Sequence, residues 1–173
     1  FLPGKHYQTT ILNSWLRLCH GEAHKVGLMG RQSCHGCNLS CGYAEVKSGK
    51  YAGLKVGNIH TWFQMGFGGL CCIDNLPAIW KCDEICNRMG MDIGDACEAI
   101  AFAMELYQNG IITEKDTDGL SLNWGDEDVI LMLLEKIAKR EDFGNILAEG
   151  SERASQRIGK GAERYAVNVK GMS

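Results

Sequence analysis

The feature that most limits how this chain can fold is a group of three cysteines in the stretch SCHGCNLSC, residues 33–41. Cys34, Cys37 and Cys41 follow the spacing C-x2-C-x3-C within eight residues. An array of this kind is typical of a metal site, and metal sites built from cysteine commonly take four protein ligands. The sequence therefore predicts a metal-binding segment, residues 33–42, that lacks one ligand nearby.

Four interpretations of the array compete. A zinc knuckle needs a second Cys/His pair at a defined separation, and the next pair, Cys71 and Cys72, is adjacent. A thioredoxin-type CHGC motif needs a βαβ context, which the predicted elements do not provide. Buried structural thiols would not ordinarily cluster between glycines. An iron–sulfur cluster uses all three thiolates, and the glycines let backbone N–H groups approach the sulfides; the radical-SAM class is disfavoured, since it has the reverse spacing, C-x3-C-x2-C.

The rest of the composition is that of an ordinary globular domain. The chain has 173 residues, 45% of them apolar, and a net charge of −3, which gives no electrostatic reason to bind nucleic acid or an anionic membrane. No apolar run approaches the roughly 18 residues that a membrane span needs. The nine cysteines are an odd number and several fall in predicted helices, so we expect free thiols, a reducing compartment and a cytoplasmic location.

Periodicity predicts a mainly α fold with a small β-hairpin and short strands. Caps and glycine stops delimit the predicted helices, and alternation predicts the strands. The absence of an initiating Met suggests that residues 1–173 are a single domain or a fragment of something larger. The predicted elements are helices over residues 10–20, 75–89, 95–109, 126–140 and 143–158, a hairpin over 42–53, and strands over 121–124 and 165–169.

Downstream of the array, several stretches occur in the order found in one enzyme family. They are EICNRMGMD (84–92), AIAFAMELYQNGIIT (99–113), WGDEDVILMLLEKIAKREDFGNILAEG (124–150) and ASQRIGKGAERYAVNVKG (154–171). From about Ser33 to the last residue the sequence resembles the aldehyde ferredoxin oxidoreductase superfamily, whose members carry tungsten, sometimes molybdenum, on a bis-pterin.

The resemblance implies a helical middle domain of a three-domain enzyme, with residues 75–173 as the helical pterin-contacting region. The family's N-terminal β domain and C-terminal helical domain would belong to the rest of the parent polypeptide. Cys34, Cys37 and Cys41 would then be three ligands of a [4Fe–4S] cluster whose fourth cysteine lies beyond Ser173. Ferredoxin or other electron-transfer subunits are the implied partners.

The family's pterin-binding motif has the form D-x-x-G-L-D, and residues 87–92 match it with two changes: Asn87 replaces the first Asp and Met91 replaces Leu. Gly90 can adopt the positive φ of a tight turn. Asp92 can accept two N–H bonds from the guanidine-like edge of a pterin. The local alternative is a helix C-cap followed by an Asp N-cap.

Two departures from the family bear on the substrate. Aldehyde-oxidising members carry a PEYET-like stretch with a glutamate near the metal, where this chain has GNIHT with His60. Cys97, in DIGDAC, begins a predicted helix whose dipole would lower the pKa of the thiol and make it a soft ligand for tungsten. Together these resemble the benzoyl-CoA reductase branch, which reduces an aromatic thioester.

His60 and His35 are the candidate catalytic residues, as proton donors. Each candidate also has a purely structural alternative. His35 could donate a hydrogen bond to a cluster sulfur, His60 could be a polar residue at a helix start, and Cys97 could be a buried helical thiol. Met89, Met91 and Met104 are expected to fill the core.

Two classes of function follow. The first is an enzyme, part of a tungstopterin/[4Fe–4S] oxidoreductase that leans to benzoyl-CoA-type reduction, with aldehyde oxidation as the alternative. The second is a non-catalytic iron–sulfur or zinc module that uses the array alone. With three cluster ligands and one pterin motif, the isolated chain is expected to be inactive.

Overall fold

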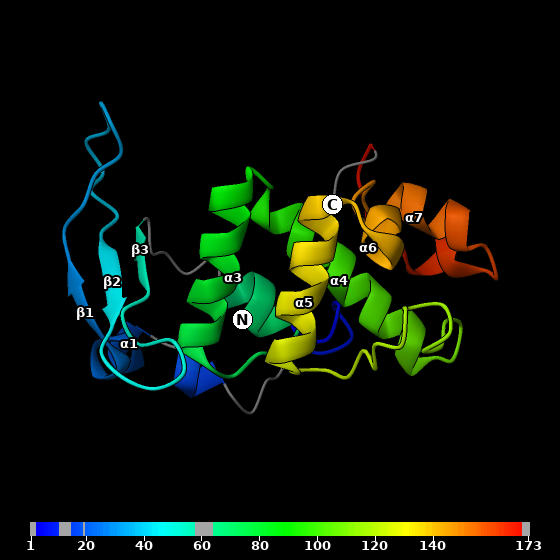
Figure 1. Ribbon diagram of the computed structural model, residues 1–173, viewed down its shortest axis with the longest axis horizontal. Helices are drawn as coiled ribbons and strands as arrows, with labels where there is room; N and C mark the ends of the chain where they lie inside the picture. Colours follow the sequence, from blue (N-terminus) through cyan, green and yellow to red (C-terminus); the bar gives the residue numbers. More distant parts are fainter. Residues whose placement is uncertain (1–2, 11–14, 19, 58–63, 171–173) are drawn as a thin grey trace.

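The computed structural model describes residues 3–10, 15–18, 20–57 and 64–170 and is mainly helical, as predicted. A small sheet lies at one end of the long axis and α7 lies at the other (Figure 1). The elements in chain order are η1 (Trp15–Leu18), α1 (His20–Val26), β1 (Gly27–Gly30), β2 (Tyr43–Val46), β3 (Lys55–Gly57), η2 (Gln64–Leu70), α3 (Leu76–Met89), α4 (Ile93–Gln108), α5 (Glu127–Lys139), α6 (Asp142–Leu147), α7 (Ser151–Ile158) and η3 (Ala162–Tyr165).

The sheet is antiparallel in the order β1-β2-β3. The β2–β3 hairpin was predicted, although β3 lies beyond residue 53. The β1 strand was not predicted; Gly27 pairs with Val46 and Gly30 with Tyr43. Of the helix predicted over residues 10–20, residues 15–18 form a 3-10 turn instead, and residues 11–14 and 19 lie outside the described residues.

The two helices on either side of the predicted pterin motif, α3 and α4, begin and end within two residues of the predicted positions. Gly90 ends α3 in the left-handed conformation, with φ of 69°. Asp92 caps α4, because its Oδ1 accepts the N–H of Asp95 at 2.9 Å, and α4 therefore begins at Ile93 rather than at residue 95. Asn75 occupies the N-cap of α3 without a side-chain cap bond.

The C-terminal third departs from prediction in three places. The helix expected over 143–158 is divided into α6 and α7 by a turn at Gly150, where φ is 82°. Residues 121–124 form no strand, and Trp124 donates its indole N–H to Gln108 Oε1 at 2.6 Å. Within 165–169, Tyr165 ends η3 and only Val169 makes a β-bridge.

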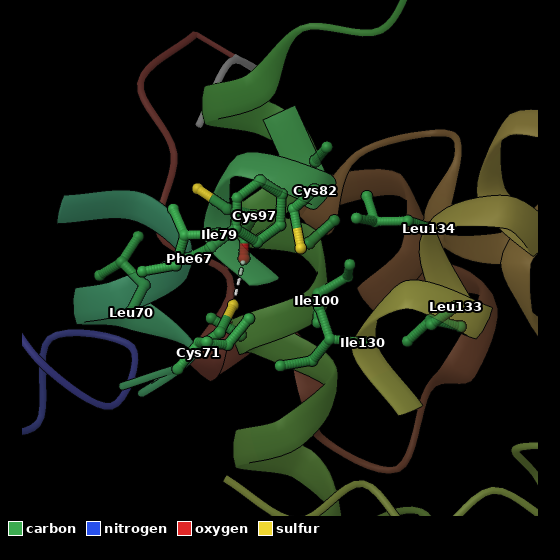
Figure 2. Close-up of a cluster of buried hydrophobic side chains, with 14 of the residues drawn as sticks. Phe67, Leu70, Cys71, Ile79, Cys82, Cys97, Ile100, Ile130, Leu133 and Leu134 are labelled. Carbon is green, nitrogen blue, oxygen red and sulfur yellow. Dashed lines mark hydrogen bonds between the residues drawn. The ribbon is translucent and has the colours of Figure 1, made fainter. Parts of the chain in front are cut away.

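The core is centred on α4, which contacts α3, α5, α6, α7, η2 and η3. Its alanines let these neighbours approach closely, and the buried side chains of α3, α5 and η2 pack around it (Figure 2). Met104 is fully buried as predicted, whereas Met89 is 48% exposed and the prediction for it was wrong. Met91 is partly buried against the core.

A buried histidine ties the N-terminal segment to α4. His6 Nδ1 lies 2.5 Å from Glu105 Oε2 and its Nε2 lies 3.2 Å from Glu98 Oε1. These hydrogen bonds raise the pKa of His6 against the opposing effect of burial. None of the described helices is long and apolar enough to cross a membrane.

Candidate cofactor site

The three cysteines of the array lie on the loop that joins β1 to β2, and all three are exposed. The N–H of Cys37 donates to the carbonyl of Cys34 at 3.0 Å, which makes a turn inside the array. The N–H of Leu39 donates to Cys37 Sγ at 3.5 Å, the kind of amide–sulfur bond that stabilises a thiolate. The antiparallel pairing of β1 with β2 therefore fixes both ends of the loop that carries these three exposed cysteines.

Glycine is required where this loop rejoins the sheet. Gly42 has φ of 95°, and a Cβ there would lie 2.7 Å from the carbonyl oxygen of Gly30. The N–H of Gly42 also donates to the carbonyl of Gln32 at 3.1 Å and closes the loop. The loop that carries the array therefore ends in a backbone turn that only glycine makes without strain.

A pocket of about 510 Å³ joins the array to α3. Cys34, Cys37 and Cys41 line it from the loop, and β3 contributes part of one wall. The α3 wall includes Asn87, the first residue of the predicted pterin motif. Two features that are far apart in the sequence therefore share one cavity. The remaining α3 residues that line it are Asp83, Glu84 and Arg88.

Hydrogen bonds to one carboxylate attach the β2–β3 hairpin to the helices. Glu127, at the start of α5, accepts from Lys50 Nζ at 3.2 Å, from the hydroxyl of Tyr51 at 2.9 Å and from the amide of Asn75 at 2.7 Å. Lys50 also pairs with Asp128. One carboxylate thus links the β2–β3 turn to the first turns of α3 and α5.

Asp83 is a site residue that the sequence analysis missed. It is only 1% exposed, and its carboxylate Oδ1 accepts a hydrogen bond from Asn87 Nδ2 at 2.7 Å. Burial raises the pKa of Asp83 to about 7, helped by the charge of Glu84 and opposed by the bond from Asn87. The available signal was an Asp four residues before Asn87 on the same helix face.

The other end of the pterin motif lies in a different place. Met91 and Asp92 line a second pocket of about 270 Å³, between the start of α4 and the end of α6. Gly90 and Asp92 here fill the local roles of helix C-cap and N-cap. The cap uses one carboxylate oxygen of Asp92, Oδ1. The role of Asp92 in cofactor binding stays a prediction.

Cys97 is 2% exposed and lies in the core rather than beside the array (Figure 2). Its thiol donates to the carbonyl of Gly94 at 3.1 Å, and a Cβ on Gly66 would lie 2.8 Å from its sulfur. Burial raises the pKa of Cys97, so the expected lowering by the helix dipole is wrong because desolvation outweighs the dipole. Cys97 borders a third, small pocket with Tyr7 and Glu98.

The two candidate proton donors lie in different parts of the chain. His35 lies on the array loop between Cys34 and Cys37 and is exposed to solvent. His60 falls in residues 58–63, which lie outside the described residues. Their catalytic roles stay predictions.

The donor set of the loop fits an iron–sulfur cluster better than a zinc ion. Zinc needs four ligands converging on one point, and within residues 3–10, 15–18, 20–57 and 64–170 no three His, Cys, Asp or Glu side chains converge on a single ion. In a four-iron cluster each thiolate binds a different iron, so its sulfurs stand farther apart. The loop supplies three exposed cysteines that line one pocket, and soft thiolates are the ligands that such a cluster takes.

The whole chain, residues 1–173, matches the family model described as aldehyde ferredoxin oxidoreductase, domains 2 and 3. The chain belongs to the aldehyde ferredoxin oxidoreductase family. The match extends to residue 1, well before the array where the resemblance in sequence was first evident.

Relatives support the assignment. The tungsten-containing aldehyde ferredoxin oxidoreductase of Thermococcus kodakarensis is 32% identical over 97% of this chain, and that of Pyrococcus furiosus is 31% identical over 91%. A P. furiosus aliphatic sulfonate oxidoreductase, WOR-like subunit, is 44% identical over half of the chain and 14% of its own length. The chain spans about a quarter of the length of the two aldehyde oxidoreductases (26% and 27%).

A solved structure has the same fold. The active-site complex BamBC of benzoyl coenzyme A reductase, in complex with 1,5-dienoyl-CoA, superimposes with a TM-score of 0.76 and 25% identity. The superposition covers all of this chain and 26% of the other. The chain is thus similar in sequence to aldehyde-oxidising enzymes and in structure to an aromatic acyl-CoA reductase.

Proposed function

We propose that this chain is part of a tungstopterin/[4Fe–4S] oxidoreductase that moves electrons between a ferredoxin-like partner, the cluster and a tungsten-bound substrate in the cytoplasm. The single observation that carries the proposal is the pocket that Cys34, Cys37 and Cys41 share with Asn87. A cluster on the loop would face a pterin held at α3, which is the arrangement that electron transfer between the two requires.

Within this proposal the residues of the chain have separate tasks. Cys34, Cys37 and Cys41 bind the cluster, and the fourth thiolate comes from outside residues 1–173. The amide of Leu39, which already contacts Cys37 Sγ, tunes the cluster. Asn87, Gly90, Met91 and Asp92 form the pterin contacts by resemblance to the family motif. When bound, tungsten (or molybdenum) on a bis-pterin supplies the two-electron chemistry.

For the substrate we propose an aromatic acyl-CoA, which would take up two electrons and two protons to give a cyclic diene. The likeness to the benzoyl coenzyme A reductase complex supports this assignment, as does the presence of Cys97 and His60 where aldehyde oxidisers differ. His60 or His35 would deliver a proton, and Cys97 would be a tungsten ligand.

The second candidate is oxidation of an aldehyde to a carboxylic acid, in which water supplies the oxygen atom, two protons are released and ferredoxin accepts the two electrons. The sequence identity to two tungsten-containing aldehyde ferredoxin oxidoreductases, over more than nine-tenths of the chain, favours it. Both candidates require the same cluster and pterin, and they differ in the direction of electron flow and in the substrate.

One pair of assays with the full-length enzyme, purified without oxygen, separates the candidates. The proposal predicts that benzoyl-CoA and a low-potential reductant give a dienoyl-CoA product, while short and aromatic aldehydes reduce ferredoxin slowly or not at all. Fast aldehyde oxidation without diene formation would establish the second candidate. Activity with neither substrate, together with zinc as the only metal, would favour a non-catalytic module.

A further inference from the structure

The side-chain amide of Asn87 is held in one orientation by a single neighbour. Asn87 Nδ2 lies 3.0 Å from the backbone carbonyl of Asp83 and 2.7 Å from its carboxylate Oδ1. A side-chain amide has two N–H donors on its nitrogen and one acceptor oxygen. Asp83 therefore provides an acceptor for each N–H of Asn87, and the Oδ1 of Asn87 remains for another partner.

The opposite orientation of this amide is disfavoured. Turning it over would place Asn87 Oδ1 against the Asp83 carbonyl, which has no hydrogen to donate in any protonation state. Asp83 is 1% exposed, so its side chain has little room in which to move. The helical spacing of four residues keeps the two side chains on the same face.

At Asn87 the pocket wall therefore presents a hydrogen-bond acceptor, Oδ1, and not a donor. Asn87 is exposed on the α3 wall of the pocket that holds the cysteine loop. A ligand that meets Asn87 there encounters an acceptor and must supply a donor. An aspartate in the same position would also accept, so the asparagine keeps the polarity of the family motif while it carries no charge.

We propose that Asp83 is a positioning residue for the pterin, because it takes both N–H groups of Asn87 and leaves an oxygen to accept from the N–H edge of the ligand. This rests on the proposed function, since a pterin is the donor-bearing group that the family motif binds. Asp83 acts through Asn87, and no contact between Asp83 and the pterin is needed.

The test is cofactor retention by the full-length enzyme, measured as pterin released on denaturation, by fluorescence, and as tungsten and iron per polypeptide. Asp83→Leu removes the carboxylate acceptor and frees the amide to turn, so pterin and tungsten should fall about fivefold. Iron should stay, because the cysteines are unchanged. Asp83→Asn should retain both cofactors, since its own Oδ1 still accepts from Asn87.

Glu84→Gln is the matched control. Glu84 lines the same pocket, but its carboxylate is bonded to Lys81 at 2.8 Å and to Arg88 at 2.6 Å, and not to Asn87. The variant removes a negative charge without altering the amide, so pterin content should equal that of the wild type. A loss as large as that of Asp83→Leu would mean that charge matters rather than amide orientation, and would overturn the proposal.

Three other results would overturn it: full pterin content in Asp83→Leu, loss of pterin in Asp83→Asn, or full pterin content in Asn87→Leu. The last variant alters an exposed position and keeps the test valid if Asp83→Leu fails to fold, which simultaneous loss of iron would reveal. A wild-type enzyme without pterin would instead contradict the proposed function itself.

Discussion

At the scale of single residues, Asp83 should make the stability of the chain depend on pH. Burial raises its pKa from 3.8 to about 7. Between these values the folded chain keeps a proton that the unfolded chain has released, so the unfolding free energy falls as pH rises through this window. Asp83→Asn does not titrate. We expect the wild type to lose on the order of 1–2 kcal/mol relative to this variant between pH 5 and pH 7.

Urea unfolding of both proteins at the two pH values measures this difference. Glu84 and Asn87 are the neighbours that act on Asp83, and both are unchanged in the variant. A constant difference between wild type and variant at pH 5 and pH 7 would show that Asp83 is already ionised at pH 5.

The cysteines should divide into two classes by reactivity. Cys34, Cys37 and Cys41 are exposed, whereas Cys97 is buried and its pKa is raised, so little of its thiolate forms at neutral pH. Iodoacetamide should therefore modify the array of the cofactor-free native chain at least tenfold faster than Cys97, as a rough bound. Mass spectrometry of the peptides gives the rates.

Unfolding in urea provides the control for this experiment, because all thiols should then react alike. Labelling of Cys97 in the native chain at the rate of the array would contradict its burial. It would also show an opening of α4 that could bring the thiol to a metal.

At the scale of elements, Glu127 should hold the hairpin against the helices. Glu127→Ala removes the acceptor that Tyr51 and Asn75 share and leaves Lys50 with Asp128 alone. We expect a loss of about 2 kcal/mol in stability and faster hydrogen exchange in β2 and β3, with little change in α7. Hydrogen exchange followed by mass spectrometry resolves the two regions.

Glu135→Ala is the comparison for Glu127→Ala. Glu135 lies on the same helix and is exposed, and its ion pair is with Lys139 four residues later. This variant should leave hairpin exchange unchanged. Equal exchange in wild type and Glu127→Ala would mean that the sheet is held by its packing alone.

The elements also show what the sequence could predict. The ends of α3 and α5 lie within one residue of the prediction, because cap residues such as Gly90 and Asp126 act within one turn. The start of α4 was predicted two residues too late. Residues 121–124 have the alternation of a strand, with Leu122 buried, but no described strand lies beside them to pair with. The β1 strand has glycine at both ends and depends on β2, a tertiary contact that local propensity does not reveal.

The site was predictable in its chemistry and less so in its geometry. The thiol spacing identified the loop, and the family motif identified Asn87, which the fold brings to the same pocket. Asp83 was missed because a charged residue next to other charged residues, here Lys81 and Glu84, is usually solvated. Its burial is a property of the folded chain that the local sequence does not reveal. The reactivity of Cys97 was misjudged because a helix dipole is weaker than full desolvation.

At the scale of the molecule, the fold places a small sheet against one end of a helical body, and the candidate cluster loop extends from the end of that sheet (Figure 1). The first pocket holds three thiols and Asn87, and the second holds Asp92. The chain spans about a quarter of the length of its relatives, and these two pockets are where the proposal places the cofactors.

Metal analysis of the full-length enzyme, purified without oxygen, shows whether the three cysteines bind an iron–sulfur cluster in a tungsten enzyme. We expect tungsten or molybdenum together with about four irons per polypeptide, and loss of the iron when Cys37 is replaced by Ser. Zinc as the only metal, or iron content unaffected by Cys37→Ser, would contradict this expectation.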